Sequence, residues 1–343
     1  MQRGASGDAL VVEGVMREVL VTGGCGFLGS AIARALLGRG HRVRILALPG
    51  ESIENVEGLD LRILRGDILD LRACQEALEG VQWVFHAAAV YKAEMADPSP
   101  MYAVNLDGTF NVLEAARRAG VERVIYTASI VALGRPSRGQ LGDEQTPYEA
   151  WEIDFAYSRT KYLSRRIAEG FARWGLDVRV ICPGIILGPG DLAPTPSGQL
   201  ILESMAPTPP LTVDGGASYV DVRDAAEVHV LAAERGRPGQ TYVATAHNLT
   251  NREFSEAIDR VLSRSRRRYE LPAPLVRGLV KAMNALDRRR GRAPRMPLHM
   301  FEYSLRPAFF SNEKASRELG ASFRPIEESI ADAIADFRAR GLV

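Results

Sequence analysis

Residues 19–29 read Val19-Leu20-Val21-Thr22-Gly23-Gly24-Cys25-Gly26-Phe27-Leu28-Gly29. The apolar run before the glycines predicts a buried strand, and the continuation from Phe27 to Arg39 predicts a helix. The glycines between them follow the spacing Gly24-x-Gly26-x-x-Gly29, which is typical of a turn that binds a dinucleotide. Such glycines permit a tight bend, close approach of the backbone to a pyrophosphate, and close packing of helix on sheet. The unpaired N–H groups at the helix start attract the phosphates.

A glycine pattern of this kind also occurs in ordinary turns, but the preceding strand and the following helix favour a dinucleotide. The choice between NAD and NADP depends on the end of the second strand, where an acidic residue binds the ribose of NAD and an arginine binds the phosphate of NADP. Neither an acidic residue nor an arginine stands at the end of the second predicted strand. Arg44 lies inside the strand and Glu51 lies beyond it, so NAD and NADP are both left as alternatives.

Apolar strand-like runs alternate with helical segments through the first half of the chain. The predicted strands are 19–22, 43–47, 61–65, 83–88, 124–127 and 178–182. Strands that are apolar on both faces and alternate with helices indicate the α/β class, with a doubly wound parallel Rossmann sheet covered by helices on both faces. The carboxyl ends of such strands share one edge, where ligands bind.

Proline and glycine become frequent after Pro183, which indicates loops and a change of domain. We expect a smaller, mostly helical C-terminal lobe that binds substrate. The expected division of the chain is residues 1–15 as a disordered extension, 16–182 as the dinucleotide-binding domain, with 219–232 and 239–245 returning to it, and 183–343 mainly as the substrate lobe.

Composition excludes several classes of protein. The 343 residues carry a formal net charge of +1, which gives no electrostatic reason to expect nucleic acid as a partner. Cys25, Cys74 and Cys182 have neither a CxxC pair nor metal-ligand spacing, so we expect free thiols, no metal site and a cytoplasmic location. No apolar run is long enough to cross a bilayer, so we expect no integral membrane association.

Tyr157 and Lys161 stand four residues apart in a predicted helix from about Phe155 to Trp174, and therefore share one face of it. The pKa of a free tyrosine is near 10, and a nearby ammonium favours the phenolate. We expect Lys161, together with the positive charge of oxidised nicotinamide, to bring the pKa of Tyr157 toward the working range, so that the phenol can transfer a proton. A surface pair on an amphipathic helix is the alternative.

Two further polar residues support a reactive site. Ser129 closes the strand that begins at Val124, where its hydroxyl can hydrogen-bond a substrate oxygen as charge develops. Its alternative role is that of a helix-capping serine. Asn105 can orient a neighbouring strand or helix, and a buried structural amide is its alternative.

These residues together resemble the extended short-chain dehydrogenase/reductases, the superfamily of NAD(P)-dependent epimerases, dehydratases and reductases. The resemblance covers nearly the whole chain after Met16, at Thr22–Gly29, Gly66–Ile68, His86–Ala89, Asn105–Asn111, Asp143–Pro147 and the triad Ser129, Tyr157 and Lys161. It implies reversible hydride transfer between nicotinamide and a carbonyl or alcohol. The implied catalytic residues are Ser129, Tyr157, Lys161 and Asn105. The implied cofactor-binding residues are Gly23, Gly26, Phe27, Leu28, Gly29, Asp67, Ile68, Ala87, Ala88, Ala89, Thr127, Tyr157, Lys161, Pro183, Ile185 and Ile186.

Residues 188–198 and 311–320 are most similar to the dihydroflavonol-reductase-like and hopanoid-associated sugar-epimerase branch. In many reductases of that branch an arginine after the second strand binds NADP, but Leu48 stands at that place here. The apolar run Cys182–Leu187 replaces a polar residue common in sugar-nucleotide epimerases, and so favours a ketone or aldehyde reductase acting on a small, fairly apolar substrate. A sugar-nucleotide epimerase or dehydratase is the alternative. A non-catalytic dinucleotide-binding regulator is disfavoured by the Tyr157–Lys161 pair.

A basic, amphipathic segment occupies residues 263–290. It could touch an acidic membrane surface as a weak peripheral contact, or a lipid-like substrate. The favoured alternative is a helix that packs its apolar stripe on its own lobe and leaves the arginines in solvent. The family resemblance also implies a homodimer, through the helices of 101–119 and 157–174. We expect the substrate pocket to involve 91–95, the loop after Gly134 and the segment after Gly188.

Overall fold

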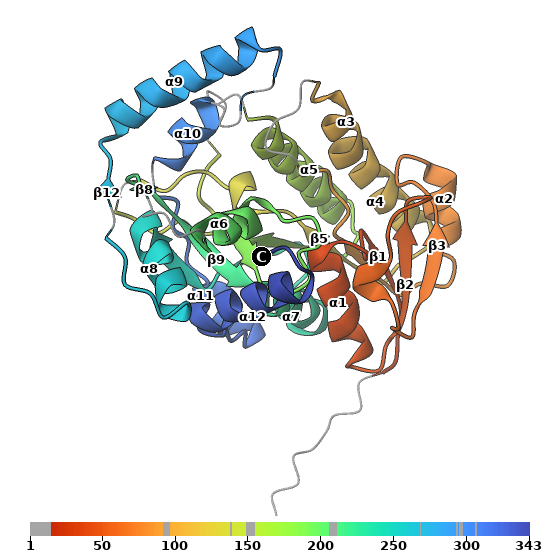
Figure 1. Cartoon of the computed structure of the whole chain (residues 1–343). Coiled ribbons are helices and arrows are strands. Elements are labelled where there is room, and N and C mark those ends of the chain that lie inside the picture. The colour runs from red at the N-terminus through yellow and green to blue at the C-terminus, as the bar shows by residue number, and fades with distance from the viewer. Residues whose placement is uncertain are drawn as a thin grey trace, which may run out of the picture.

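A seven-stranded parallel sheet forms the larger unit of the computed structural model (Figure 1). The structure describes residues 15–91, 97–137, 139–148, 155–205, 211–267, 269–292, 294, 298–305 and 307–343. The strand order is β10-β6-β5-β4-β1-β2-β3. The strands are β1 (Glu18–Thr22), β2 (Arg42–Ala47), β3 (Arg62–Arg65), β4 (Trp83–His86), β5 (Arg123–Thr127), β6 (Val178–Pro183) and β10 (Thr241–Ala244). The predicted extension 1–15 lies outside the described residues, apart from Val15.

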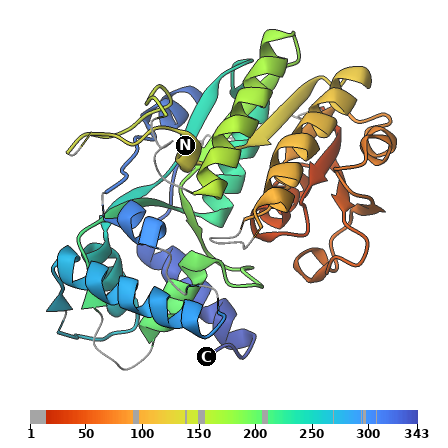
Figure 2. The same cartoon turned by 90° about the horizontal axis from the view of Figure 1, so that it is seen from above.

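Helices cover both faces of this sheet, which explains why its central strands are apolar on both sides (Figure 2). One face packs against α1 (Phe27–Leu37), α7 (Val222–Arg235) and α11 (Glu313–Leu319). The other packs against α2 (Leu71–Ala77), α4 (Thr109–Arg118) and α5 (Ala156–Arg173). The predicted doubly wound Rossmann fold is confirmed.

The chain reverses its direction across the sheet between β1 and β4. From β1 it moves outward through β2 to β3, and then returns to β4 on the other side of β1. In an open parallel sheet, the crevice beyond the carboxyl ends of the strands at such a reversal is where ligands bind.

The smaller lobe is built around two short sheets that the sequence did not predict. One contains β7 (Ile185–Leu187), β9 (Gly216–Asp221) and β11 (His247–Thr250), and the other pairs β8 (Leu211–Thr212) with β12 (Tyr269–Glu270). The helices of the lobe are α6 (Pro196–Met205), α8 (Asn251–Val261), α9 (Ala273–Arg289), α10 (Leu298–Ser304) and α12 (Ile326–Ala339). In the apolar core of this lobe, the ring of Tyr219 stacks on that of Phe254, with 4.3 Å between the ring centroids.

Two predicted segments differ in detail from the structure. Within 219–232, the strand residues lie in the small sheet through β9, whereas α7 packs against α1 and the large sheet. The expected single helix 101–119 is α3 (Ser99–Tyr102), a π-helical segment η2 (Ala103–Gly108) and then α4. Within the described residues, no helix is long and apolar enough to cross a membrane.

Candidate active site

The glycine turn between β1 and α1 leaves no room for side chains. Gly23 has φ +68°, and a Cβ there would lie 2.7 Å from the backbone of Ala88. A Cβ on Gly29 would lie 2.1 Å from the carbonyl oxygen of Gly23. Helix α1 begins after Gly26 with no side-chain cap and no acidic residue in its first turn. Its free N–H groups and positive dipole end therefore fit the pyrophosphate of a dinucleotide.

A buried histidine fixes the crevice between β1 and β4. His86 contacts the hydroxyls of Thr22 at 2.6 Å and Thr109 at 3.1 Å through its two ring nitrogens. The pKa of His86 is lowered to about 3, mainly by burial and to a smaller extent by the charge of Lys161. The ring is therefore neutral at physiological pH. His86 thus holds the strand ends together, and the implied cofactor segment Ala87–Ala89 follows directly.

Polar side chains fix the backbone that follows β3. Asn111 donates from Nδ2 to the carbonyl oxygen of Ile68 at 3.0 Å, and Asp67 Oδ1 accepts from the Leu69 N–H at 2.9 Å. A Cβ on Gly108 would lie 2.6 Å from the Ile68 side chain, so the π-helical segment packs tightly there. The backbone at the implied cofactor-binding residues Asp67 and Ile68 is therefore held in place.

The loop after β2 carries one carboxylate and one guanidinium of interest for cofactor choice. Arg65 donates to the carbonyl oxygens of Leu48 at 2.9 Å and Glu51 at 3.0 Å, and the Glu51 carboxylate accepts from the Leu48 N–H at 2.9 Å. Burial raises the pKa of the Cys25 thiol in the glycine turn, Glu51 raises it further, and Arg65 lowers it. Both charges therefore act at the dinucleotide turn. Arg44 instead pairs with Glu18.

Ser129 and Tyr157 meet at the carboxyl end of β5. The Ser129 hydroxyl lies close enough to the Tyr157 phenol to lower its pKa. It also accepts from the Val131 N–H at 3.3 Å, as the N-cap of a short 3₁₀ turn, η3 (Ile130–Ala132). The serine thus fills its alternative role as a cap while lying against the phenol.

Lys161 is buried beneath this pair, with 4% of its surface exposed. Its ammonium donates to the carbonyl oxygen of Thr127 at 3.0 Å and lies 5.8 Å from the ring centroid of Tyr126. Burial lowers the pKa of Lys161 to about 8, so the group is mostly charged at neutral pH. The end of β5 therefore fixes the position of this charge.

The protein's own residues move the pKa of Tyr157 upward. Burial raises it, as do the phenols of Tyr91 and Tyr126, and the Ser129 hydrogen bond lowers it only in part. The predicted lowering toward the working range also depends on the positive charge of oxidised nicotinamide, and it stays a prediction for the enzyme with its cofactor bound. The pKa rises among the protein's own residues because burial disfavours the phenolate, while the ammonium of Lys161 is directed to Thr127. The phenol is held in its proton-carrying form.

Asn105 joins the loop after β4 to the catalytic helix. Its Oδ1 accepts from the Val90 N–H at 2.8 Å, and its Nδ2 donates to the Val90 carbonyl at 3.1 Å and to Thr160 Oγ1 at 3.1 Å. The side chain is 2% exposed. Thr160 directly precedes Lys161 on α5, so Asn105 orients the site and lies in the π-helical segment η2.

A second buried histidine contacts the site, and no sequence pattern indicated it. His229 on α7 lies 2.9 Å from Thr127 Oγ1 through Nε2 and 2.7 Å from the Ala225 carbonyl through Nδ1. A carbonyl only accepts, so Nδ1 carries the hydrogen and Nε2 accepts from Thr127. Burial lowers the pKa of His229 to about 4. It therefore supports the implied cofactor residue Thr127.

Aromatic side chains line the approach to the phenol. The ring of Tyr91 meets that of Tyr157 edge-on at 4.5 Å, and the Phe155 ring lies 5.9 Å away. Of the expected pocket segment 91–95, only Tyr91 belongs to the described residues. Pro183 ends β6, and Ile185 and Ile186 begin β7 at the entrance to the small lobe. The surroundings of the phenol are largely apolar.

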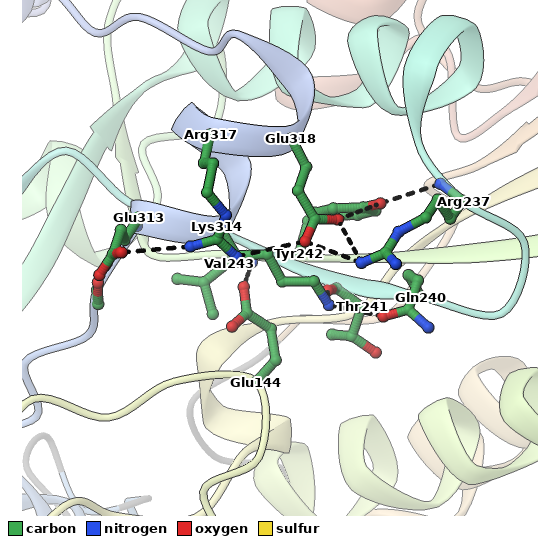
Figure 3. Close-up of polar contacts among 11 residues, drawn as sticks. Glu144, Arg237, Gln240, Thr241, Tyr242, Val243, Glu313, Lys314, Arg317 and Glu318 are labelled. Carbon is green, nitrogen blue, oxygen red and sulfur yellow. Dashed lines mark hydrogen bonds and ion pairs between the residues drawn. The ribbon is translucent and has the colours of Figure 1, made fainter.

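The loop 139–148 is tied to the edge of the large sheet (Figure 3). The Glu144 carboxylate accepts from the Val243 N–H at 2.8 Å, and Lys314 donates to the Thr241 carbonyl at 2.8 Å. Figure 3 shows the nearby Arg237 and Arg317 directed at Glu318. These charges line a polar surface pocket of about 380 Å³, in which acids and bases pair with one another. Within the described residues no cluster fits a metal ion.

Comparison with known proteins agrees with this geometry. Residues 19–245 match the model of the NAD dependent epimerase/dehydratase family. The chain belongs to that family. It is thus an enzyme of the extended short-chain dehydrogenase/reductase type, and its cofactor is NAD or NADP.

Individual relatives of this family member span almost its full length. It is 32% identical to a putative dihydroflavonol 4-reductase of Synechocystis over 94% of this chain and 95% of the relative. It is also 32% identical to sterol demethylase protein B of Methylococcus capsulatus over 94% of this chain and 99% of the relative. The crystal structure of gox2253 superimposes with a TM-score of 0.85 at 35% identity, over 95% of this chain and 99% of the other.

Proposed function

We propose that this enzyme reduces a ketone or aldehyde carbonyl of a small, fairly apolar substrate. The observation that carries the proposal is the Tyr157 phenol, which burial keeps protonated and which lies beside the Ser129 hydroxyl and one helical turn before the buried Lys161. A phenol in its protonated form can donate a proton to an oxygen that gains negative charge. Ser129, Tyr157 and Lys161 are the residues that we assign to catalysis.

Each residue has a defined task in this proposal. The bound nicotinamide, when reduced, supplies the hydride. Tyr157 gives its proton to the substrate oxygen, and Ser129 donates a hydrogen bond to the same oxygen as charge develops. Lys161 holds a positive charge below the phenol and stabilises the phenolate left after proton transfer. Asn105 keeps α5 in register with the loop after β4.

The apolar character of the substrate is inferred from what faces the phenol. Tyr91 and Phe155 lie against Tyr157, and Ile185 is 37% exposed at the start of the small lobe. The reductase and sterol-related names of the two relatives are consistent with such a substrate. A sugar nucleotide would need more polar partners in this region.

We also propose that NAD is preferred over NADP. At the thiol of Cys25 in the glycine turn, the effect of Glu51 exceeds that of Arg65. A carboxylate at this loop accepts hydrogen bonds from the adenosine ribose and repels an added phosphate. Leu48 supplies no positive charge there.

A homodimer and a cytoplasmic location complete the proposal. Helices α4 and α5 lie side by side on one face of the sheet, and Phe110 and Trp174 at their surfaces are 45% and 71% exposed. Burying these rings supports a dimer through both helices. The three cysteines are buried free thiols, which suits a reducing compartment. Sedimentation velocity tests the dimer, since a monomer at micromolar concentration would contradict it.

An absorbance assay at the reduced-nicotinamide band tests the activity. NADH and NADPH are each offered with ketones, aldehydes, flavonoid-like compounds and sugar nucleotides. We expect oxidation of NADH by an apolar carbonyl compound. Epimerisation of a sugar nucleotide without net cofactor oxidation, detected by chromatography, would overturn the reductase assignment. Cofactor binding without turnover on any member of the panel would favour a regulator.

A further inference from the structure

Helix α9 has a buried polar face and an exposed apolar one. Val280, Asn284 and Asp287 face inward, and Arg277 pairs with Glu302 of α10. The outward residues are Leu275, Leu279, Met283 and Leu286, which are 53%, 51%, 44% and 46% exposed. Their spacing of four, four and three residues places them in one stripe. The favoured expectation that this stripe packs on its own lobe is wrong.

The same segment concentrates positive charge. Residues 264–292 contain ten arginines and lysines and two acidic residues, although the net charge of the whole chain is only +1. Arg288, Arg289, Arg290 and Arg292 are exposed at the end of α9. Apolar and basic side chains therefore share one surface, which we call the α9 surface (Leu275, Leu279, Met283, Leu286 and 288–292).

The α9 surface is open to a large, flat partner. In both views α9 lies at the outer edge of the small lobe, and its main contact is with α10 (Figures 1 and 2). At the beginning of the segment, Tyr269 is 52% exposed. Tyrosines of this kind suit the boundary between a membrane and water.

We propose that the α9 surface docks on an anionic lipid bilayer. The leucines and methionine enter the boundary between headgroups and acyl chains, while the arginines contact lipid phosphates. Charge complementarity favours lipid over a second copy of this chain, because two α9 surfaces would bring like charges together. The proposal goes beyond the proposed function and does not depend on any substrate.

Vesicle co-sedimentation of the full chain tests the proposal. Vesicles of phosphatidylcholine alone are compared with vesicles containing about one-third phosphatidylglycerol, at low and high salt. We expect binding to the anionic vesicles at low salt, at least tenfold weaker binding to neutral ones, and release at high salt. Absence of binding to anionic vesicles at low salt would overturn the proposal.

Two variants and two matched controls locate the contact. Leu279→Gln/Met283→Gln and Arg288→Gln/Arg289→Gln/Arg290→Gln should each weaken binding at least tenfold. Leu342→Gln removes an exposed leucine elsewhere, and Arg62→Gln/Arg72→Gln/Arg173→Gln removes three exposed arginines from the large unit, so both controls should bind as the parent does. Unchanged circular dichroism and NADH binding establish folding. Equal loss in controls and variants, or dissociation of an oligomer by Leu279→Gln/Met283→Gln, would contradict docking on lipid.

Discussion

The ammonium of Lys161 on α5 donates to the carbonyl oxygen of Thr127, the last residue of β5, at 3.0 Å. Thr127 in turn contacts His229 of α7 through its hydroxyl at 2.9 Å. Helices on opposite faces of the sheet therefore meet at one residue of the central strand. This arrangement fixes the catalytic charge independently of Tyr157, whose phenol is directed to Ser129.

Asn105→Leu should destabilise the protein, because it leaves both backbone groups of Val90 without their partner and removes one of the two hydrogen bonds of the Thr160 hydroxyl. The expected loss in free energy of unfolding is about 2–4 kcal/mol, measured in urea. Asn111→Leu, which removes hydrogen bonds to the carbonyls of Ile68 and Leu69 nearer the surface, should lose about 1 kcal/mol. Only the Asn105 variant should also lower kcat. Equal effects of the two variants would contradict a positioning role.

Glu51→Gln should shift the cofactor preference toward NADP. Removing the carboxylate takes away the repulsion of an added phosphate and leaves the Arg65 guanidinium in the same loop. We expect kcat/KM for NADPH relative to NADH to rise about tenfold, the size of one charge-assisted hydrogen bond. Arg65→Gln should move the ratio the other way. If neither change alters the ratio of kcat/KM for NADPH to that for NADH, the loop after β2 does not contact the adenosine ribose of the cofactor.

Glu144→Ala should expose the edge of the large sheet. The Val243 N–H then loses its acceptor, since β10 is an edge strand in the described sheet. We expect a loss of about 1–2 kcal/mol in free energy of unfolding and faster hydrogen exchange at the Val243 amide. Gln145→Ala changes the exposed neighbour and should leave that exchange rate as in the parent. Unaltered exchange in Glu144→Ala would refute this role for the loop.

His229 should make the protein sensitive to acid. Its pKa is lowered from 6.5 to about 4 by burial, so between these values the unfolded chain binds more protons than the folded one. Stability therefore falls as pH drops through this window, by roughly 3 kcal/mol from this group, and is unaffected by it above pH 6.5.

Urea unfolding at stepped pH measures this effect. In His229→Gln the free energy of unfolding should fall less steeply with decreasing pH than in the parent protein. His86, whose pKa is about 3, should account for much of the remaining pH dependence. The same slope in His229→Gln and in the parent protein would exclude the proposed cause.

The large sheet could be predicted because its signals are local. The run Val19–Thr22, the glycines after it and the apolar start of α1 specify strand, turn and helix within about twenty residues. Tyr157 and Lys161 were found for the same reason, since their spacing places them on one helical face.

The remaining features depend on contacts between distant segments. Strands β8 and β12 have two residues each and exist only because they pair across the fold. His229 and Thr127 are in contact although they are 102 residues apart in the sequence, and no sequence pattern near either residue predicts that contact. The rise in the pKa of Tyr157 also follows from burial in the folded chain and from the phenols of Tyr91 and Tyr126, which lie far away in sequence.

Proton transfer by Tyr157 is tested most directly by turnover of Tyr157→Phe, once a substrate is identified. The change removes one oxygen and leaves the ring packed against Tyr91. We expect kcat to fall by a factor of about 10²–10⁴, the usual contribution of a general acid, while the Kd for NADH measured by fluorescence changes little. Tyr269→Phe, at a remote exposed tyrosine, should keep the parent kcat. Parent-like turnover in Tyr157→Phe would contradict the proposed mechanism.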